Sequence, residues 1–338
     1  MNKNQLIIKS FRSIYWAAQR LLLLKKCPLH IAIIASCSLI ALSLPARAVD
    51  ISFGGTVLFN WWNPAWNNRK IIMYSPDLQV MPSTNAPLYS IIQSYNYGPD
   101  LTVRFLRNWE IGASFRYSQG ETTAANPSLS PYTGRQRFGI SYDLYDTYAR
   151  AGYYVLEFLM PYAGLRVEFL DSETEFDQVR LLIPYNIIHA DMKGDMLKFT
   201  PELGLHFTVP LSSFFTFIFD FSGTFQSGTD RFDYQNIIDQ WKLRFDFPPI
   251  PVGRFYAIGC STLAAFKLNI PKIDTSISLG GHYRLLRYIQ KTSDRSFFDL
   301  DKSLDHTYGI TCSIEYTFST EKNRGKRLWI PHPEYPSR

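Results

Sequence analysis

Ionisable side chains recur at alternate positions within the apolar stretches of this 338-residue chain, and these residues are the best suited to chemistry. The set with this spacing is Arg104, Glu110, Arg116, Arg166, Glu168, Lys198, Glu202, His206, Asp220, His282, Arg284 and Glu315. Alternate side chains of a strand point to one face, so we expect these residues to share one enclosed space. Opposite charges there either pair into a salt-bridged plug, because an unpaired buried charge is costly, or line a narrow aqueous channel. Both interpretations stay open at this point.

Candidates for catalysis are few. Two Asp/His pairs, His189 with Asp191 and Asp305 with His306, contain residue types that activate water, but they lie in different predicted loops. His206 is a further candidate general base, although an apolar residue follows it. The chain has no G-x-S-x-G, H-E-x-x-H, P-loop or zinc-type spacing. We therefore predict no catalytic residues.

Metal and thiol chemistry have equally little support. The carboxylates of Asp299, Asp301 and Asp305 could bind Ca²⁺, but such acid clusters are usually solvated loop surface. Cys260 and Cys312 both belong to the apolar face of their strands, and a whole strand is expected between them. Two strand spacings exceed the reach of a disulfide. We predict no metal, no cofactor and no disulfide.

The elements that position these residues are strands with two different faces. From Val49 onward, apolar and polar residues alternate with a period of two, the pattern of a strand between two environments. In residues 214–226 the apolar face consists of Phe215, Phe217, Phe219, Phe221 and Phe225, and the polar face of Thr216, Asp220, Ser222, Thr224 and Gln226. A helix would scatter both sets around its axis, so the chain is predicted to be all-β.

The alternation predicts about ten strands. They are residues 50–62, 92–106, 109–120, 137–158, 162–176, 194–209, 213–227, 253–268, 274–289 and 306–318. The fourth is ambiguous, because Asp146 and Arg150 interrupt its apolar positions: it contains a bulge or forms two short strands. The strand number is thus about eight to twelve.

Short and long connections alternate along the chain. The short ones are 107–108, 159–161, 210–212 and 269–273, and the long polar ones are 63–91, 121–136, 177–193, 228–252 and 290–305. This organisation predicts a transmembrane antiparallel up-and-down β-barrel, with tight periplasmic turns and longer extracellular loops. A soluble β-sandwich is the alternative, but its outward face would be polar, whereas here one face of the strands is apolar.

Aromatic residues make up 16% of the chain, more than an ordinary soluble core requires. In a membrane barrel they gather at the strand ends as girdles at the two interfaces. The predicted girdle residues are Trp61, Trp62, Trp109, Tyr117, Tyr154 and Tyr316. We interpret the tryptophan-rich residues 60–66 as girdle and loop start; the alternative is a binding site.

The first 48 residues have the composition of a secretory signal peptide. Residues 1–30 contain six basic residues and no acid, residues 31–44 are apolar, and residues 46–48 form an A-x-A cleavage site. An uncleaved anchor and a lipoprotein signal at Cys37 are the alternatives. Cleavage removes seven of the 35 Lys and Arg, leaving 28 against 29 Asp and Glu. The formal charge falls from +6 to −1, so nucleic acid is not expected as a partner.

The last strand ends in Tyr316, Thr317 and Phe318. This ending resembles the C-terminal insertion signal of outer-membrane β-barrel proteins, and the resemblance implies that the barrel-assembly machinery reads Tyr316 and Phe318. The family pattern usually stops at that Phe, whereas here residues 319–338 continue as a basic, Pro-rich tail. In size the chain resembles the OmpW-type barrels and the omptin proteases, but residues 60–63 lack the acidic pair that omptins need.

Together these expectations divide the chain into a signal peptide (1–48), an outer-membrane barrel (49–318) and a periplasmic tail (319–338). The predicted function is a narrow pore for passive passage of small solutes in a Gram-negative-type outer membrane. A structural or adhesin-like barrel with a closed lumen is the second hypothesis, and an omptin-like protease is the third. Expected partners are outer-membrane lipid, the barrel-assembly machinery and small solutes. For the tail, cell-wall polymer is one expected partner, and a solvated tail without function is the favoured alternative.

Overall fold

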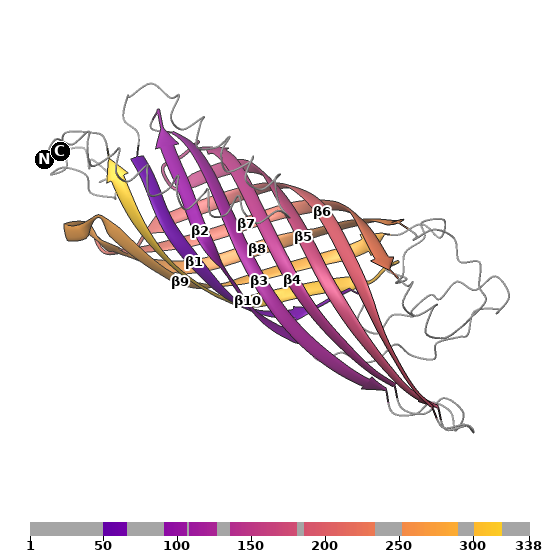
Figure 1. Ribbon diagram of the computed structural model, residues 1–338. Helices are drawn as coiled ribbons and strands as arrows, with labels where there is room; N and C mark the ends of the chain where they lie inside the picture. Colours follow the sequence, from indigo (N-terminus) through magenta and orange to yellow (C-terminus); the bar gives the residue numbers. More distant parts are fainter. Residues whose placement is uncertain are drawn as a thin grey trace, which may run out of the picture. The chain divides into compact units, whose positions relative to one another are not determined.

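The computed structural model describes residues 50–65, 91–106, 108–126, 136–180, 186–233, 252–289 and 301–319. They form a closed barrel of ten strands, each paired antiparallel with its neighbours in the sequence (Figure 1). The first strand pairs with the last, from Asp50 opposite Ser319 to Asn63 opposite His306, and this pairing closes the sheet. The predicted all-β, up-and-down barrel is therefore confirmed.

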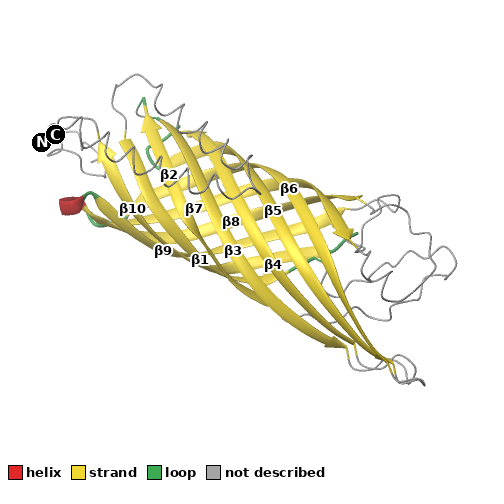
Figure 2. Ribbon diagram, viewed as in Figure 1, coloured by secondary structure: helices red, strands yellow, loops and turns green. Residues whose placement is uncertain are grey.

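The ten strands occupy almost all of the described residues. They are β1 (Asp50–Asn63), β2 (Ile92–Phe105), β3 (Trp109–Asn126), β4 (Gln136–Tyr153), β5 (Leu159–Arg180), β6 (Asn186–Pro210), β7 (Phe215–Asp233), β8 (Val252–Ile270), β9 (Thr275–Ile289) and β10 (Leu304–Ser319). A short 3-10 helix, η1 (Pro271–Ile273), forms the turn between β8 and β9 (Figure 2). Within the described ranges, no helix has the length and apolar character needed to cross a bilayer.

Strand β4 is continuous. Its ladder with β3 runs unbroken from Trp109 opposite Tyr153 to Asn126 opposite Gln136, and its ladder with β5 is equally regular. The expected bulge or split is therefore wrong. Asp146 and Arg150 of β4 point into the barrel and pair with opposite charges there, so they do not disturb the strand.

Strands β3, β5 and β6 are longer than the alternation predicts, whereas β4 ends at Tyr153 and not at residue 158. Residues 121–126 and 186–193 are strand rather than loop. The pairing of β2 with β3 stops at Gln119 and that of β7 with β6 at Lys193, while β5 and β6 remain paired to their shared turn. The four strands thus continue past their neighbours as an open extension of the sheet (Figure 1). In this extension the backbones stay paired although neither face of the strands is purely apolar. The alternation of apolar and polar residues therefore ends earlier along the sequence than the backbone pairing does.

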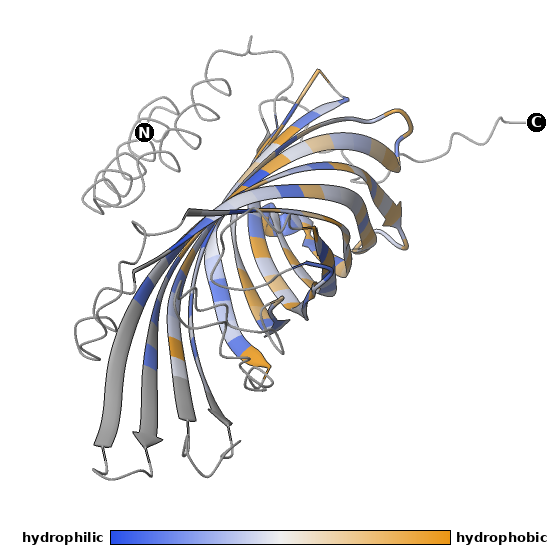
Figure 3. Ribbon diagram, turned by 90° about the vertical axis from the view of Figure 1, so that its right-hand side faces the viewer, coloured by the Kyte–Doolittle hydropathy of each residue, from blue (hydrophilic) through white to orange (hydrophobic). Residues whose placement is uncertain are grey.

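The barrel is apolar outside and polar inside, the reverse of a soluble protein. Leu203 exposes 73% of its surface, whereas the adjacent Glu202 exposes 4%. Figure 3 shows how apolar and polar residues alternate along the strands. On β7, Phe215, Phe221 and Phe225 are exposed, and the intervening polar side chains are largely buried in the lumen. The two faces predicted for residues 214–226 are confirmed.

Two predicted segments lie outside the described residues. These are the signal peptide (1–48) and residues 320–338 of the tail, and both remain predictions. Ser319 belongs to β10 rather than to the tail, because it pairs with Asp50.

Candidate functional site in the barrel lumen

Among the described residues, the inward side chains line a smaller and a larger cavity inside the barrel. The smaller, of about 230 Å³, is lined by residues that include Trp62, Lys198 and Arg284. The larger, of about 920 Å³, is lined among others by Arg104 and by residues 155–158 of the turn between β4 and β5, so it reaches the short-turn end of the barrel. Inward side chains therefore leave open space in the lumen.

Each member of the alternating ionisable set lines one of these cavities. Arg166, Glu168, Lys198, Glu202, His282 and Arg284 line the smaller cavity, Arg104, Glu110, His206 and Glu315 line the larger one, and Arg116 and Asp220 line both. The structure thus brings together, in one lumen, residues from seven different strands. Their role in conduction is a proposal and is argued below.

A series of ion pairs and hydrogen bonds, which we call the Arg150 network, crosses the lumen through Arg104, Glu110, Arg150, Asp220 and His206. The guanidinium of Arg150 lies 3.0 Å from a Glu110 oxygen and 3.4 Å from an Asp220 oxygen. Arg104 donates to Glu110 at 3.0 Å, and His206 Nδ1 lies 2.7 Å from Asp220 Oδ2. Strands β4 and β7 are not neighbours, so the pair Arg150–Asp220 spans the interior.

A second set of ion pairs lies at the smaller cavity. Arg166 contacts Asp146 at 3.2 Å and Glu202 at 3.4 Å. Arg284 on β9 donates to Glu168 on β5 at 2.6 Å, which is another contact across the lumen. Guanidinium groups suit this position because their planar fork of donors can serve two carboxylates from different strands.

A partition separates the two cavities. The residues that line both are Arg116, Tyr148, Arg150, Asp220 and Leu263. We call these five shared residues the partition. The Arg150–Asp220 ion pair belongs to it, so the Arg150 network decides how the two spaces communicate.

The sequence-based set missed Arg150 and Asp146. Both are an even number of positions from Ile140 and Tyr142, so they lie on the same face of β4 as those two residues, which are buried on its inner side. Because Ile140 and Tyr142 are apolar, the alternation predicts the lipid side for this face of β4, so it does not find Asp146 or Arg150. Lys267, which lies 2.5 Å from Glu315, was missed although it too has inward parity on β8.

Two predicted girdle residues point inward, so the prediction is wrong for Trp62 and Tyr154. Trp62 Nε1 donates to Asp305 Oδ1 at 2.9 Å. The Tyr154 hydroxyl donates to Glu110 at 3.1 Å and accepts from Arg104 at 2.6 Å. Trp61 and Trp62 are consecutive in one strand, so only one of them can face lipid.

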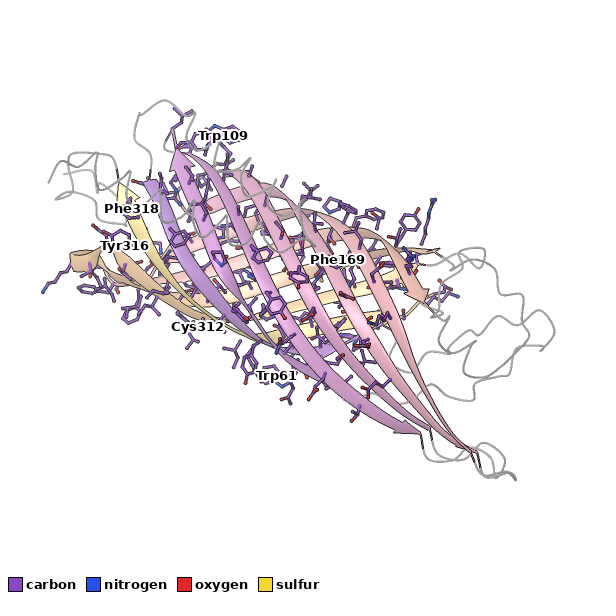
Figure 4. The ribbon with its side chains drawn as sticks, viewed as in Figure 1. Trp61, Trp109, Phe169, Cys312, Tyr316 and Phe318 are labelled. Carbon is purple, nitrogen blue, oxygen red and sulfur yellow. The ribbon has the colours of Figure 1, made fainter. Side chains whose placement is uncertain are left out.

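The other predicted girdle residues lie on the outer face, where Figure 4 labels three of them. They are Trp61, Trp109, Tyr117 and Tyr316. Each contacts another outward ring: centroid distances are 5.7 Å from Trp61 to Tyr308, 5.2 Å from Trp109 to Tyr153, 5.8 Å from Tyr117 to Tyr97 and 4.5 Å from Tyr316 to Phe318. Their position at the membrane borders stays a prediction, as does the insertion role of Tyr316 and Phe318.

The Asp305/His306 pair does not form a dyad. Asp305 is buried in the lumen against Trp62, whereas His306 is on the opposite face and contacts the hydroxyl of Tyr283 at 3.0 Å. The side chains of His189 and Asp191 lie outside the described residues, as does Asp299 of the considered calcium site. Within the described residues, no group of three or more His, Cys, Asp or Glu side chains could hold a metal ion.

Both cysteines lie on the outer face with free thiols, as their parity predicts (Cys312 is labelled in Figure 4). Cys260 lies opposite Leu285 of β9 and Cys312 opposite Leu279 of the same strand, so β9 separates them.

The outer surface and the closure of the sheet decide what this barrel is. An apolar outer face matches lipid, and a closed sheet leaves no backbone edge unpaired in hydrocarbon. Aromatic pairs, strands alternating between lipid and lumen, and a polar interior complete the features of an outer-membrane barrel. The chain forms an integral outer-membrane β-barrel.

No family model matches the sequence of this outer-membrane barrel, and no curated protein matches it. Among solved structures, it is similar to the outer membrane protease OmpT from Escherichia coli (11% identity, 80% of this chain and 96% of that chain, TM-score 0.36). It is also similar to the translocator domain of the autotransporter NalP from Neisseria meningitidis (9%, 90% and 98%, 0.42). A third is the Pseudomonas putida toluene transporter TodX (8%, 82% and 90%, 0.31). Such low similarity transfers neither activity nor substrate to this chain.

Proposed function

We propose that the barrel is a narrow pore through which small polar solutes cross the outer membrane passively. The observation that carries this proposal is open space on both sides of one partition of side chains, within a single polar lumen. The proposed partners are the surrounding lipid, the assembly machinery that inserts the barrel, and the solutes themselves.

The volume of the lumen supports a water-filled path. At about 30 Å³ per water molecule, the larger cavity of about 920 Å³ has room for on the order of 30 waters. The ion pairs of the lumen do not fill this space. Charges of both signs line the lumen and are paired with one another, so the wall favours polar solutes over apolar ones.

Planar-bilayer recording of the refolded barrel tests this function. The wild type should show stable conducting steps. The double variant Arg150→Ala/Asp220→Ala removes both side chains of the cross-lumen pair and joins the two cavities, so its single-channel conductance should rise severalfold.

The matched control is Lys267→Ala/Glu315→Ala, which removes a pair at the wall of the larger cavity and away from the partition. It should change the conductance little. A heat-modifiability gel verifies that each variant is a folded barrel. If the wild type and the partition variant are both folded and neither conducts, the result contradicts the pore.

A closed barrel that acts through its surface is the second candidate. Two observations favour it: ion pairs cross the lumen at Arg150–Asp220 and Glu168–Arg284, and β3 to β6 extend beyond their neighbours. A folded wild-type barrel that does not conduct would support this candidate. The omptin-like protease now depends on His189 and Asp191, and peptide cleavage that is lost in His189→Ala would support it.

A further inference from the structure

A hydroxyl, an imidazole and a carboxylate form a continuous chain of contacts in the larger cavity. Thr208 Oγ1 lies 3.0 Å from His206 Nε2, and His206 Nδ1 lies 2.7 Å from Asp220 Oδ2. All three residues line this cavity. These distances are within the reach that a nucleophile, its base and the group that orients the base require.

The carboxylate defines the tautomer of His206. Asp220 also pairs with Arg150 and is therefore an acceptor, so Nδ1 of the neutral imidazole must carry the proton and donate it to Asp220. This leaves the lone pair of Nε2 to accept the Thr208 hydroxyl. The arrangement is the one in which imidazole can take a proton from a hydroxyl.

Strands β6 and β7 hold Thr208, His206 and Asp220 in fixed positions. Thr208 and His206 are two residues apart on β6 and so share its inner face, and Asp220 lies directly opposite His206 on β7. Arg150 anchors the Asp220 carboxylate from across the lumen and is itself held by Glu110. A site built on paired strands keeps its geometry better than one on loops.

Access differs along the chain of contacts. His206 exposes 8% of its surface, whereas Thr208 is half-buried and faces the cavity. Of the histidines whose side chains the structure describes, His282 has no hydrogen-bond partner at Nδ1 and His306 contacts a tyrosine on the outer face. Only His206 among them lies between a hydroxyl and a carboxylate.

We propose that Thr208, His206 and Asp220 hydrolyse small, water-soluble carboxylic esters in the larger cavity. The site faces the lumen and not the lipid, which favours a soluble ester over a membrane lipid as substrate. The ion pairs Arg104–Glu110 and Lys267–Glu315 line the same cavity and make its wall polar, which favours an ester with a polar acyl group.

The reaction balances with water as the only co-reactant. Thr208 Oγ1 attacks the ester carbonyl carbon as His206 Nε2 takes the hydroxyl proton; the bond to the alcohol oxygen breaks, and His206 returns the proton to the departing alkoxide. The product is an acyl-Thr208. Water then attacks the acyl carbon, His206 takes a water proton and gives it to Thr208 Oγ1, and the carboxylic acid leaves. Asp220 orients the imidazole and stabilises its cationic form.

Hydrolysis of p-nitrophenyl acetate by the refolded full chain tests this site. Thr208→Val keeps the branched shape but lacks the hydroxyl, and His206→Gln lacks the base. Each should lower the rate by about 100-fold or more, as loss of a general base does. Thr208→Ser keeps the hydroxyl and should retain hydrolysis.

Thr102→Val is the matched control, because Thr102 is also half-buried and lines the same cavity. It should hydrolyse the ester at the wild-type rate. A fluorophosphonate should label the peptide that contains Thr208 in the wild type and not in His206→Gln. The proposal would be overturned if the wild type hydrolysed the ester no faster than Thr208→Val, or if the fluorophosphonate labelled another residue. Thr208→Val should still conduct ions as the wild type does. A failure of the hydrolysis proposal can therefore be told apart from a failure of the proposed pore.

Discussion

Arg150 shows how one side chain organises the interior of this barrel. Its guanidinium serves Glu110 on β3 and Asp220 on β7, and its centre lies 5.5 Å from the ring centroid of Tyr162. A lysine ammonium could not reproduce this fork of donors. Removal of either carboxylate would leave charge without its partner in the lumen, which is far costlier than breaking a surface pair.

Consecutive tryptophans give a test at the residue scale. Trp61 faces outward and Trp62 lies in the lumen, bonded to Asp305. In liposomes, brominated phospholipid should quench a single-tryptophan variant that keeps Trp61, because its ring touches lipid. A variant that keeps only Trp62 should be quenched far less.

The two variants have the other six of the seven tryptophans replaced by Phe and are otherwise identical. Acrylamide quenching in the same liposomes reports access from water and serves as the control. Equal quenching of both variants by the brominated lipid would refute the inward orientation of Trp62.

At the scale of the elements, closure of the barrel and extension of its strands are separable. Closure depends on the β1–β10 ladder, whereas the far ends of β5 and β6 pair beyond the point where β7 ends. The extension therefore adds strand pairs without contributing to the ring of ten strands.

A shortened hairpin tests this independence. Glu175 and Asp191 lie directly opposite each other in the β5–β6 ladder, so residues 176–190 can be replaced by Asn-Gly without a change of register. The shortened chain should still refold and shift on a heat-modifiability gel, because the pairs that close the barrel are intact. Loss of that shift would show that the extension is needed for folding.

Deletion of residues 304–319 is the control for this experiment. It removes β10 and leaves β1 and β9 without the strand that joins them. This variant should lose the heat-dependent shift, since an open sheet edge in lipid leaves backbone groups unpaired.

For the whole molecule, the reversed polarity is the defining property. Leu203 is the most exposed large apolar residue among the described side chains, and it lies near the middle of the barrel portion of β6. In water such a residue would tolerate a charge. On a lipid-facing surface, Leu203→Arg should lower the free energy of unfolding by about 2–4 kcal/mol, the cost of arginine near the bilayer midplane.

Reversible denaturant unfolding in liposomes measures this cost. Thr229→Arg, an outward position near the end of β7, is the control and should cost about 1 kcal/mol or less, because the penalty falls toward the interface. A negligible effect of Leu203→Arg in folded protein would contradict a lipid-facing position.

The sequence by itself determined the strands, their faces and most of the lumen. Alternation is a local property: side chains two residues apart share a face whatever the rest of the chain does. Glu202 could therefore be assigned to the inside and Leu203 to the outside before any contact was known. On β4 the same rule fails, because apolar Ile140 and Tyr142 share the inward face with Asp146 and Arg150.

Only the tertiary structure decided which side chains meet. Arg150 and Asp220 are 70 residues apart in the chain, and Arg284 and Glu168 are 116 apart. Side-chain alternation can place a residue inside but does not say which residue it faces, because partners across a lumen depend on strand number and on the stagger at closure. The pairing of β1 with β10 also turned Trp62 toward Asp305. Asp220 contacts His206 for a more local reason, since β6 and β7 are neighbours in the sheet. Closure of β1 on β10 therefore decided the contacts across the lumen, since only a closed ring defines what lies across it.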